Sequence, residues 1–194
     1  MGRHREFDIE QALRIATQEF WRKGYDNTSI SDLTAAMKIT APSFYFAFGS
    51  KEGLFQRIVE VYQTAQNRII DDALKQTTPM NVLRKLLLGF ADFLSDPAHP
   101  PGCLLLNSSI PVTKGHPFSP TFAEQRRALR LALENRFRQL GREGATLPAG
   151  ATPAGVAQMV VSLIWGMAVE AQSGAPRSEL RKIAATAGRQ VGLD

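Results

Sequence analysis

The chain has 194 residues, a formal net charge of +5 and a single cysteine, Cys103. This length can build one sizeable core, or a small domain joined to a larger one. One cysteine excludes an intrachain disulfide framework, and the polar first residues lack the apolar segment of a signal peptide. The most apolar stretch, Val156 to Val169, has 14 residues and is too short to span a bilayer. We therefore expect a cytoplasmic protein without a membrane partner.

Two short helices are predicted in the first 38 residues. The first ends at Gly24, since glycine is typical of helix C-termini. The second can be capped by Thr28 or Ser29, whose hydroxyl oxygens can accept a backbone N–H. Apolar residues recur every three or four positions, as in amphipathic helices: Ile9, Leu13, Ala16 and Phe20 in the first helix, and Ile30, Leu33 and Met37 in the second.

A third helix is predicted to begin after Thr40, in the aromatic segment TAPSFYFAFGSKE. Phe44 and Phe48 are four residues apart, so they share the face that packs on the first two helices. The outer face then carries Ala41, Pro42, Ser43, Tyr45 and Phe46. Two short helices joined by a tight turn, the second with an exposed face, form a helix-turn-helix that fits a DNA major groove.

The residue types on this outer face suit DNA. Small side chains let the helix backbone approach base edges, Pro42 can contact a thymine methyl group, and Ser43 can hydrogen-bond to a base or phosphate. The Tyr45 hydroxyl can reach a phosphate oxygen. The alternative for Tyr45 and Phe46 is packing against a neighbouring domain.

The rest of the chain predicts more helices and no strands. A long helix from Ser50 to about Gln76 is followed by helices at 79–95, 120–141, 153–173 and 177–192. Thr78, Ser119 and Thr152 each precede a proline, the pattern of a hydroxyl N-cap with proline in the first turn. No period-two alternation is present, so we predict an all-α fold.

Two binding surfaces are expected in the C-terminal part. The helix at 153–173 is apolar nearly all round, so one side should face its own core. The other side should form a four-helix homodimer interface together with the helix at 177–192. A mostly apolar cavity for a small hydrophobic effector is predicted nearby. Its candidate lining residues are Phe90, Phe93, Cys103, Asn107, Phe122 and Trp165.

Catalysis and metal binding have little support in the sequence. His99 and His116 lie in proline-rich segments with no acid at a spacing that would place it beside them. The spacing of His99, Cys103 and His116 does not match a structural zinc site. We expect no enzyme activity, no catalytic residue, no metal and no cofactor. Cys103 is either a small buried residue or a redox sensor.

One ordered set of motifs runs through the first part of the chain: Gly24-Tyr25, Thr28-Ser29-Ile30, Asp32-Leu33, Ile39-Thr40, Pro42-Ser43-Phe44-Tyr45 and Phe48-Gly49-Ser50-Lys51-Glu52-Gly53-Leu54-Phe55. The set resembles the DNA-binding domain of the TetR (tetracycline-repressor-like) family of transcriptional regulators, over about Asp8 to Val61. Lys38 departs from the family, whose members most often have glycine in this turn. A non-glycine residue with positive φ there costs on the order of 1 kcal/mol.

The resemblance implies a homodimeric repressor that binds a palindromic operator. Residues 1–50 would form the DNA-binding domain, and residues 51–194 the helical domain for dimerisation and a small apolar effector that releases the DNA. The residues implied in base contacts are Ala41, Pro42 and Ser43, and those implied in phosphate contacts are Thr28, Tyr45 and Lys51. Ser29, Thr40 and Phe46 complete the predicted DNA-binding set. Two alternatives stay open: a DNA-binding dimer without an effector, and a redox sensor acting through Cys103.

Overall fold

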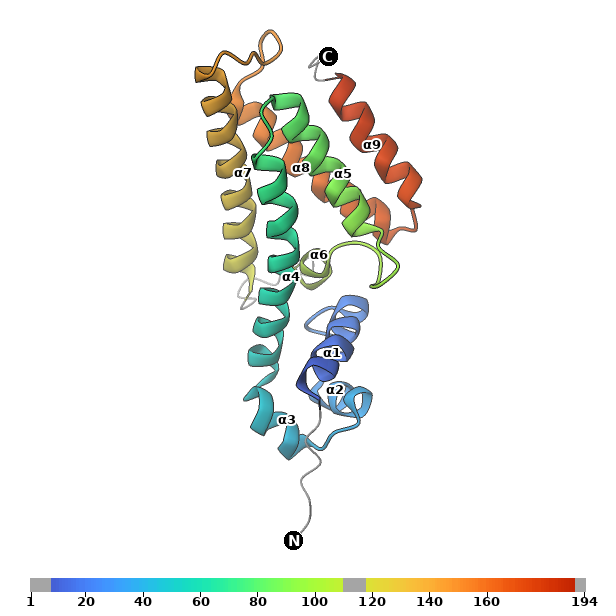
Figure 1. The fold of residues 1–194 in the computed structure, drawn as a ribbon. Helices are drawn as coiled ribbons and strands as arrows, with labels where there is room; N and C mark the ends of the chain where they lie inside the picture. The colour runs from blue at the N-terminus through green and yellow to red at the C-terminus, as the bar shows by residue number, and fades with distance from the viewer. Residues whose placement is uncertain (1–7, 110–117, 191–194) are drawn as a thin grey trace.

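The computed structural model describes residues 8–109 and 118–190, and these residues form helices and no strands, which confirms the all-α fold (Figure 1). His116, which the sequence did not favour as a catalytic or metal-binding residue, therefore lies outside the described residues. The helices are α1 (Ile9–Lys23), α2 (Ile30–Met37), α3 (Ala41–Phe48), α4 (Lys51–Leu74), α5 (Pro79–Leu94), α6 (Leu104–Ser109), α7 (Ser119–Arg142), α8 (Pro153–Gln172) and α9 (Arg177–Gln190).

The helix starts agree with the sequence except in two places. Thr78 and Thr152 cap α5 and α8, and their hydroxyl oxygens accept the backbone N–H of the third residue of each helix, Asn81 and Gly155. The predicted cap at Ser119 is wrong, because α7 already includes this residue and Phe118 occupies the cap position without a side-chain hydrogen bond. The six-residue helix α6 was not predicted, since it is too short to show a periodic pattern.

The N-terminal part packs α1, α2 and α3 around the start of α4 (Figure 1). Phe20, Leu33, Phe44 and Phe55 are completely buried there. The ring of Phe55 on α4 meets that of Phe20 on α1 edge-on, with 4.9 Å between centroids. The first turns of α4 thus belong to the N-terminal core, while its second half reaches the other helices, so the division at residue 50 stays a prediction.

The larger part is a bundle in which α5 contacts α4, α8 and α9, and α7 packs along α8. Arg177 and Arg181 of α9 both pair with Asp92 of α5, at 2.8 and 2.7 Å. The 20 residues of α8 are long and apolar enough to cross a membrane by length and composition, which corrects the expectation from the shorter apolar stretch. Eight of them are buried inside the bundle.

The junction between the two parts is made by α6 and the end of α1. The last carbonyl oxygens of a helix have no partner within it, and the Asn107 side chain on α6 donates to one of them, the oxygen of Trp21, at 2.8 Å. Gly24, which ends α1, has φ +78, and a Cβ there would lie 3.0 Å from the Asn107 carbonyl oxygen. Only glycine suits both this backbone conformation and this close approach.

Candidate nucleic-acid interface and ligand cavity

The helix-turn-helix is formed by α2, a tight turn and α3. Ser29 caps α2 in a capping box with Asp32, in which each side chain accepts the backbone N–H of the other residue. Lys38 ends α2 with φ 56 and ψ 41, in the left-handed region, as expected for a residue that replaces glycine in the turn. Thr40 then caps α3 by accepting the Ser43 N–H. The turn therefore has the predicted geometry despite its lysine.

The outer face of α3 is exposed, as its sequence predicted. Phe44 and Phe48 are buried, whereas Ala41 and Pro42 are exposed and Ser43 is partly exposed. Further along the same helix, 49% of Tyr45 and 95% of Phe46 are accessible to solvent.

Lys51 stands at the start of α4, directly after this face. Its Nζ lies 4.2 Å from the centroid of the Tyr25 ring, a cation–π contact that holds the ammonium near the helix N-terminus. Partial burial lowers the pKa of Lys51, while the charges of Asp26 and Glu52 oppose that shift. The first backbone N–H groups of α4 lie at the same end of the helix as the Lys51 ammonium. Together they favour an anion such as phosphate.

Thr28 differs from its expected role. Its side chain is completely buried, and its hydroxyl donates to the Gly24 carbonyl oxygen at 2.7 Å. No part of this side chain can therefore reach a phosphate without a rearrangement of the turn after α1. Its role here is to hold that turn, and Ser29 beside it remains exposed.

The bundle contains a cavity of about 330 Å³ between α4, α7 and α8, with α5 and α6 at its inner end. Phe90, Cys103 and Trp165 line it, as predicted. Sequence reasoning missed its polar wall, which consists of Gln63, Gln66, Asn67 and Asp71 on α4 and Gln125 and Arg126 on α7. The recurrence of amides every three or four residues on α4 was the available signal.

Three other predicted lining residues do not border this cavity. Phe93 packs with Tyr62 and His99, with 5.3 Å between ring centroids in both cases, and both of those rings contact Trp21 of α1. Asn107 bonds to α1, and Phe122 is buried with its ring stacked near Phe118. The pattern of apolar residues alone could not distinguish these positions from the cavity lining.

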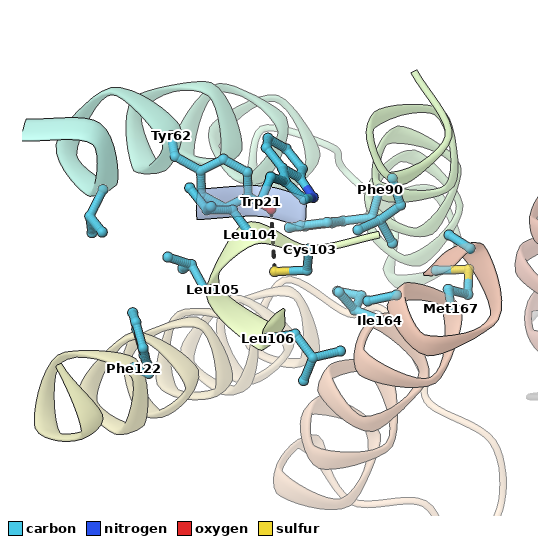
Figure 2. Close-up of a cluster of buried hydrophobic side chains, with 14 of the residues drawn as sticks. Trp21, Tyr62, Phe90, Cys103, Leu104, Leu105, Leu106, Phe122, Ile164 and Met167 are labelled. Carbon is cyan, nitrogen blue, oxygen red and sulfur yellow. Dashed lines mark hydrogen bonds between the residues drawn. The ribbon is translucent and has the colours of Figure 1, made fainter. Parts of the chain in front are cut away.

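Cys103 lies at the centre of the bundle, beside the cavity (Figure 2). The Tyr62 hydroxyl donates to its Sγ at 3.3 Å. Burial raises the pKa of the Cys103 thiol, although the bond from Tyr62 opposes this shift. Reactive cysteines have a lowered pKa and access to solvent, so the structure does not favour the redox alternative. Among the described residues, no group of three or more His, Cys, Asp or Glu side chains could hold a metal.

A capped two-helix unit with a buried aromatic face and an exposed outer face defines a helix-turn-helix DNA-binding protein. Residues 12–58 match the model of the family described as "Bacterial regulatory proteins, tetR family". The chain belongs to this family, and it is a DNA-binding transcriptional regulator.

Similar proteins support this assignment over the whole chain. The HTH-type transcriptional repressor ComR of Escherichia coli (strain K12) is 26% identical over 95% of this chain and 89% of its own. A cysteine mutant of the TetR family transcriptional regulator CifR, complexed with 26-bp double-strand operator DNA, is 30% identical with a TM-score of 0.82, covering 96% of this chain and 98% of that chain. A TetR transcriptional regulator from Rhodococcus sp. RHA1 is 33% identical with a TM-score of 0.64, covering 94% of this chain and 98% of that chain.

Proposed function

We propose that this protein is a cytoplasmic homodimeric repressor that binds a palindromic operator through α3 and is released when a small molecule enters the cavity between α4, α7 and α8. The observation that carries the DNA-binding part is the outer face of α3, where Tyr45 and Phe46 are exposed over a fully buried Phe44. The base contacts are assigned to Ala41, Pro42 and Ser43.

The phosphate contacts are assigned to Tyr45 and Lys51, on either side of the α3–α4 turn. Phe46 would pack its ring against the sugar-phosphate backbone at the groove edge. Ser29 and Thr40 are exposed, but their hydroxyls already cap α2 and α3. They contribute by fixing the helix starts, and each could add one contact to a phosphate.

Effector binding can act on DNA binding by two routes. The helix α4 carries Lys51 at one end and the cavity residues Gln63 to Leu74 at the other, within a single run of 24 residues. The short α6 has Leu105 at the cavity and Asn107 bonded to α1. A ligand that fits the cavity better in one tilt of these helices would change the separation of the two recognition helices in a dimer.

The homodimer is supported by the outer face of α8. Met159 and Val169 are exposed there, and Ser162 and Gly166 lie between them at helical spacing. The expected contribution of α9 stays a prediction. Leu180 and Ala184 are buried against the chain's own core, so a partner contact from α9 would use the partly buried Ile183 and Ala187 and the exposed residues beside them.

The dimer can be tested at Gly166, where an added Cβ would meet no atom within 4 Å. Gly166→Glu should therefore leave the monomer unstrained while placing a charge on the α8 face. Analytical ultracentrifugation should show dissociation to monomers. Gly141→Glu on α7 is the matched control, since that site is equally open. If both variants remain dimers, the dimer interface does not include this face of α8.

DNA binding is tested by fluorescence anisotropy with duplexes that flank the protein's own gene, at several salt concentrations. Lys51→Ala should weaken binding and reduce the salt slope by about one unit for each phosphate that the ammonium neutralises. Lys75→Ala, at the far end of α4, is the control because Lys75 pairs with Asp72 away from α3. Equal behaviour of both variants would exclude Lys51 from the interface.

A further inference from the structure

The cavity between α4, α7 and α8 has two chemically different walls. Its inner end is apolar and is formed by Phe90, Leu94, Leu105 and Ile164. Cys103 lies at the same end, and its thiol is already hydrogen-bonded to Tyr62 (Figure 2). A ligand should therefore bring an apolar body to this end, because the Cys103 sulfur already accepts from Tyr62 and a thiol is only a weak donor.

The opposite wall is made of amides. Gln63, Gln66 and Asn67 are three and four residues apart on α4, so they share one face of that helix. Gln125 faces them from α7, and all four line the cavity. Amides can donate and accept hydrogen bonds without adding charge.

Gln125 is the most informative of these amides. Its Nε2 is buried and has no hydrogen-bond partner within the described residues. A buried N–H donor without a partner is unfavourable, and such groups are normally satisfied by protein, water or ligand. The Gln125 side chain lines the cavity, so a rotation of its amide group would present this donor to an acceptor atom there.

The charged residues of the lining do not select for a charged ligand. Asp71 and Arg126 have opposite signs, so their contributions to the potential in the cavity oppose each other. The Arg126 guanidinium is also already placed over the Trp165 ring, 5.1 Å from its centroid. A carboxylate in the cavity would be attracted by Arg126 and repelled by Asp71, and an ammonium the reverse, so a charged ligand gains little net electrostatic energy to offset its desolvation.

We propose that the effector is a small uncharged molecule with an apolar body and one hydrogen-bond acceptor, such as a carbonyl oxygen, that receives the Gln125 Nε2–H. This assignment rests on the proposed effector role of the cavity. The cavity volume of about 330 Å³ is near the lower end of the roughly 300–1,000 Å³ typical of ligand pockets, which favours a compact ligand.

The experiment uses three probes of similar size: acetophenone, which has the carbonyl acceptor; ethylbenzene, which lacks it; and benzoate, which is charged. Binding to the full-length protein without DNA is measured by ligand-observed NMR titration. We expect acetophenone to bind more tightly than the other two probes. Gln125→Leu keeps the side-chain size and removes the donor, so it should weaken acetophenone binding on the order of fivefold and leave ethylbenzene unchanged.

Gln139→Leu is the control on the same helix, since Gln139 lies outside the cavity lining and donates to Glu143. The proposal is overturned if none of the probes binds, if benzoate or ethylbenzene binds as tightly as acetophenone, or if Gln125→Leu and Gln139→Leu have the same effect. Release of operator DNA by acetophenone is measured separately. Binding without release would contradict the proposed effector role of the cavity and leave the ligand class standing.

Discussion

Removal of the Asn107 side chain should loosen the junction between the DNA-binding part and the bundle. In Asn107→Ala the Trp21 carbonyl oxygen no longer accepts from the Nδ2 donor, which lies 2.8 Å away in the wild type. Loss of a hydrogen bond to a buried group costs about 1–3 kcal/mol. The Asn107 Oδ1 is itself buried without a partner within the described residues, and its removal offsets part of that cost. We therefore expect a decrease of about 1 kcal/mol in the free energy of unfolding.

For a chain of this size, 1 kcal/mol corresponds to a decrease of about 2–4 °C in melting temperature. Urea and thermal denaturation followed by circular dichroism measure both quantities. Ser108→Ala is the matched control on the same helix, because the buried Ser108 Oγ has no partner within the described residues and its removal should be neutral or stabilising. If Ser108→Ala destabilises as much as Asn107→Ala, or if Asn107→Ala has no effect, the Trp21 bond does not stabilise the junction.

Three further predictions concern other sites. Lys38→Gly should increase the free energy of unfolding by up to about 1 kcal/mol in urea denaturation, because it relieves the positive φ; a decrease would contradict this. Hydrogen bonds from Ser29, with a smaller contribution from Lys23, lower the pKa of Asp32 to about 2. This carboxylate therefore stabilises the fold above about pH 4, and the contribution disappears as the pH falls toward 2. When the pH falls from about 4 toward 2, the free energy of unfolding of Asp32→Asn, measured by urea titration, should therefore decrease less than that of the wild type. Parallel decreases in the two proteins would exclude this contribution of Asp32. Iodoacetamide at pH 8 should alkylate Cys103 far more slowly in the native protein than in the urea-unfolded chain, because the thiol is buried and its pKa is raised. Equal rates would support the alternative that Cys103 is reactive.

The sequence was most informative where local chemistry determines the structure. Thr78 and Thr152 correctly predicted the starts of two helices. The hydroxyl accepts a backbone N–H of the first turn, and the proline after it has no N–H that needs a partner. The spacing of Phe44 and Phe48 separated the two faces of α3, because residues four apart lie on the same side of a helix.

Features that depend on packing between distant segments were not predictable. Phe93 and Asn107 are of suitable type for a cavity, yet Phe93 packs on Tyr62 of α4 and Asn107 bonds to α1. The tertiary arrangement determines which side of each helix meets its neighbours. The spacing of apolar residues along the sequence does not reveal that arrangement. Thr28 shows the same limit, since its burial depends on how the turn after α1 folds back.

The two tryptophans lie at the two places where ligand entry and a movement of α1 would alter the surroundings of a ring. Trp165 borders the cavity under the Arg126 guanidinium, and Trp21 stacks on His99 at the junction, 4.2 Å between ring centroids. Indole emission responds to nearby charge and polarity, so each ring reports on a different event without an added label. In a Trp21→Phe variant the remaining fluorescence would follow cavity occupancy, and in Trp165→Phe it would follow the movement of α1. Comparison of the two emission time courses would show whether the DNA-binding part moves together with ligand entry or after it.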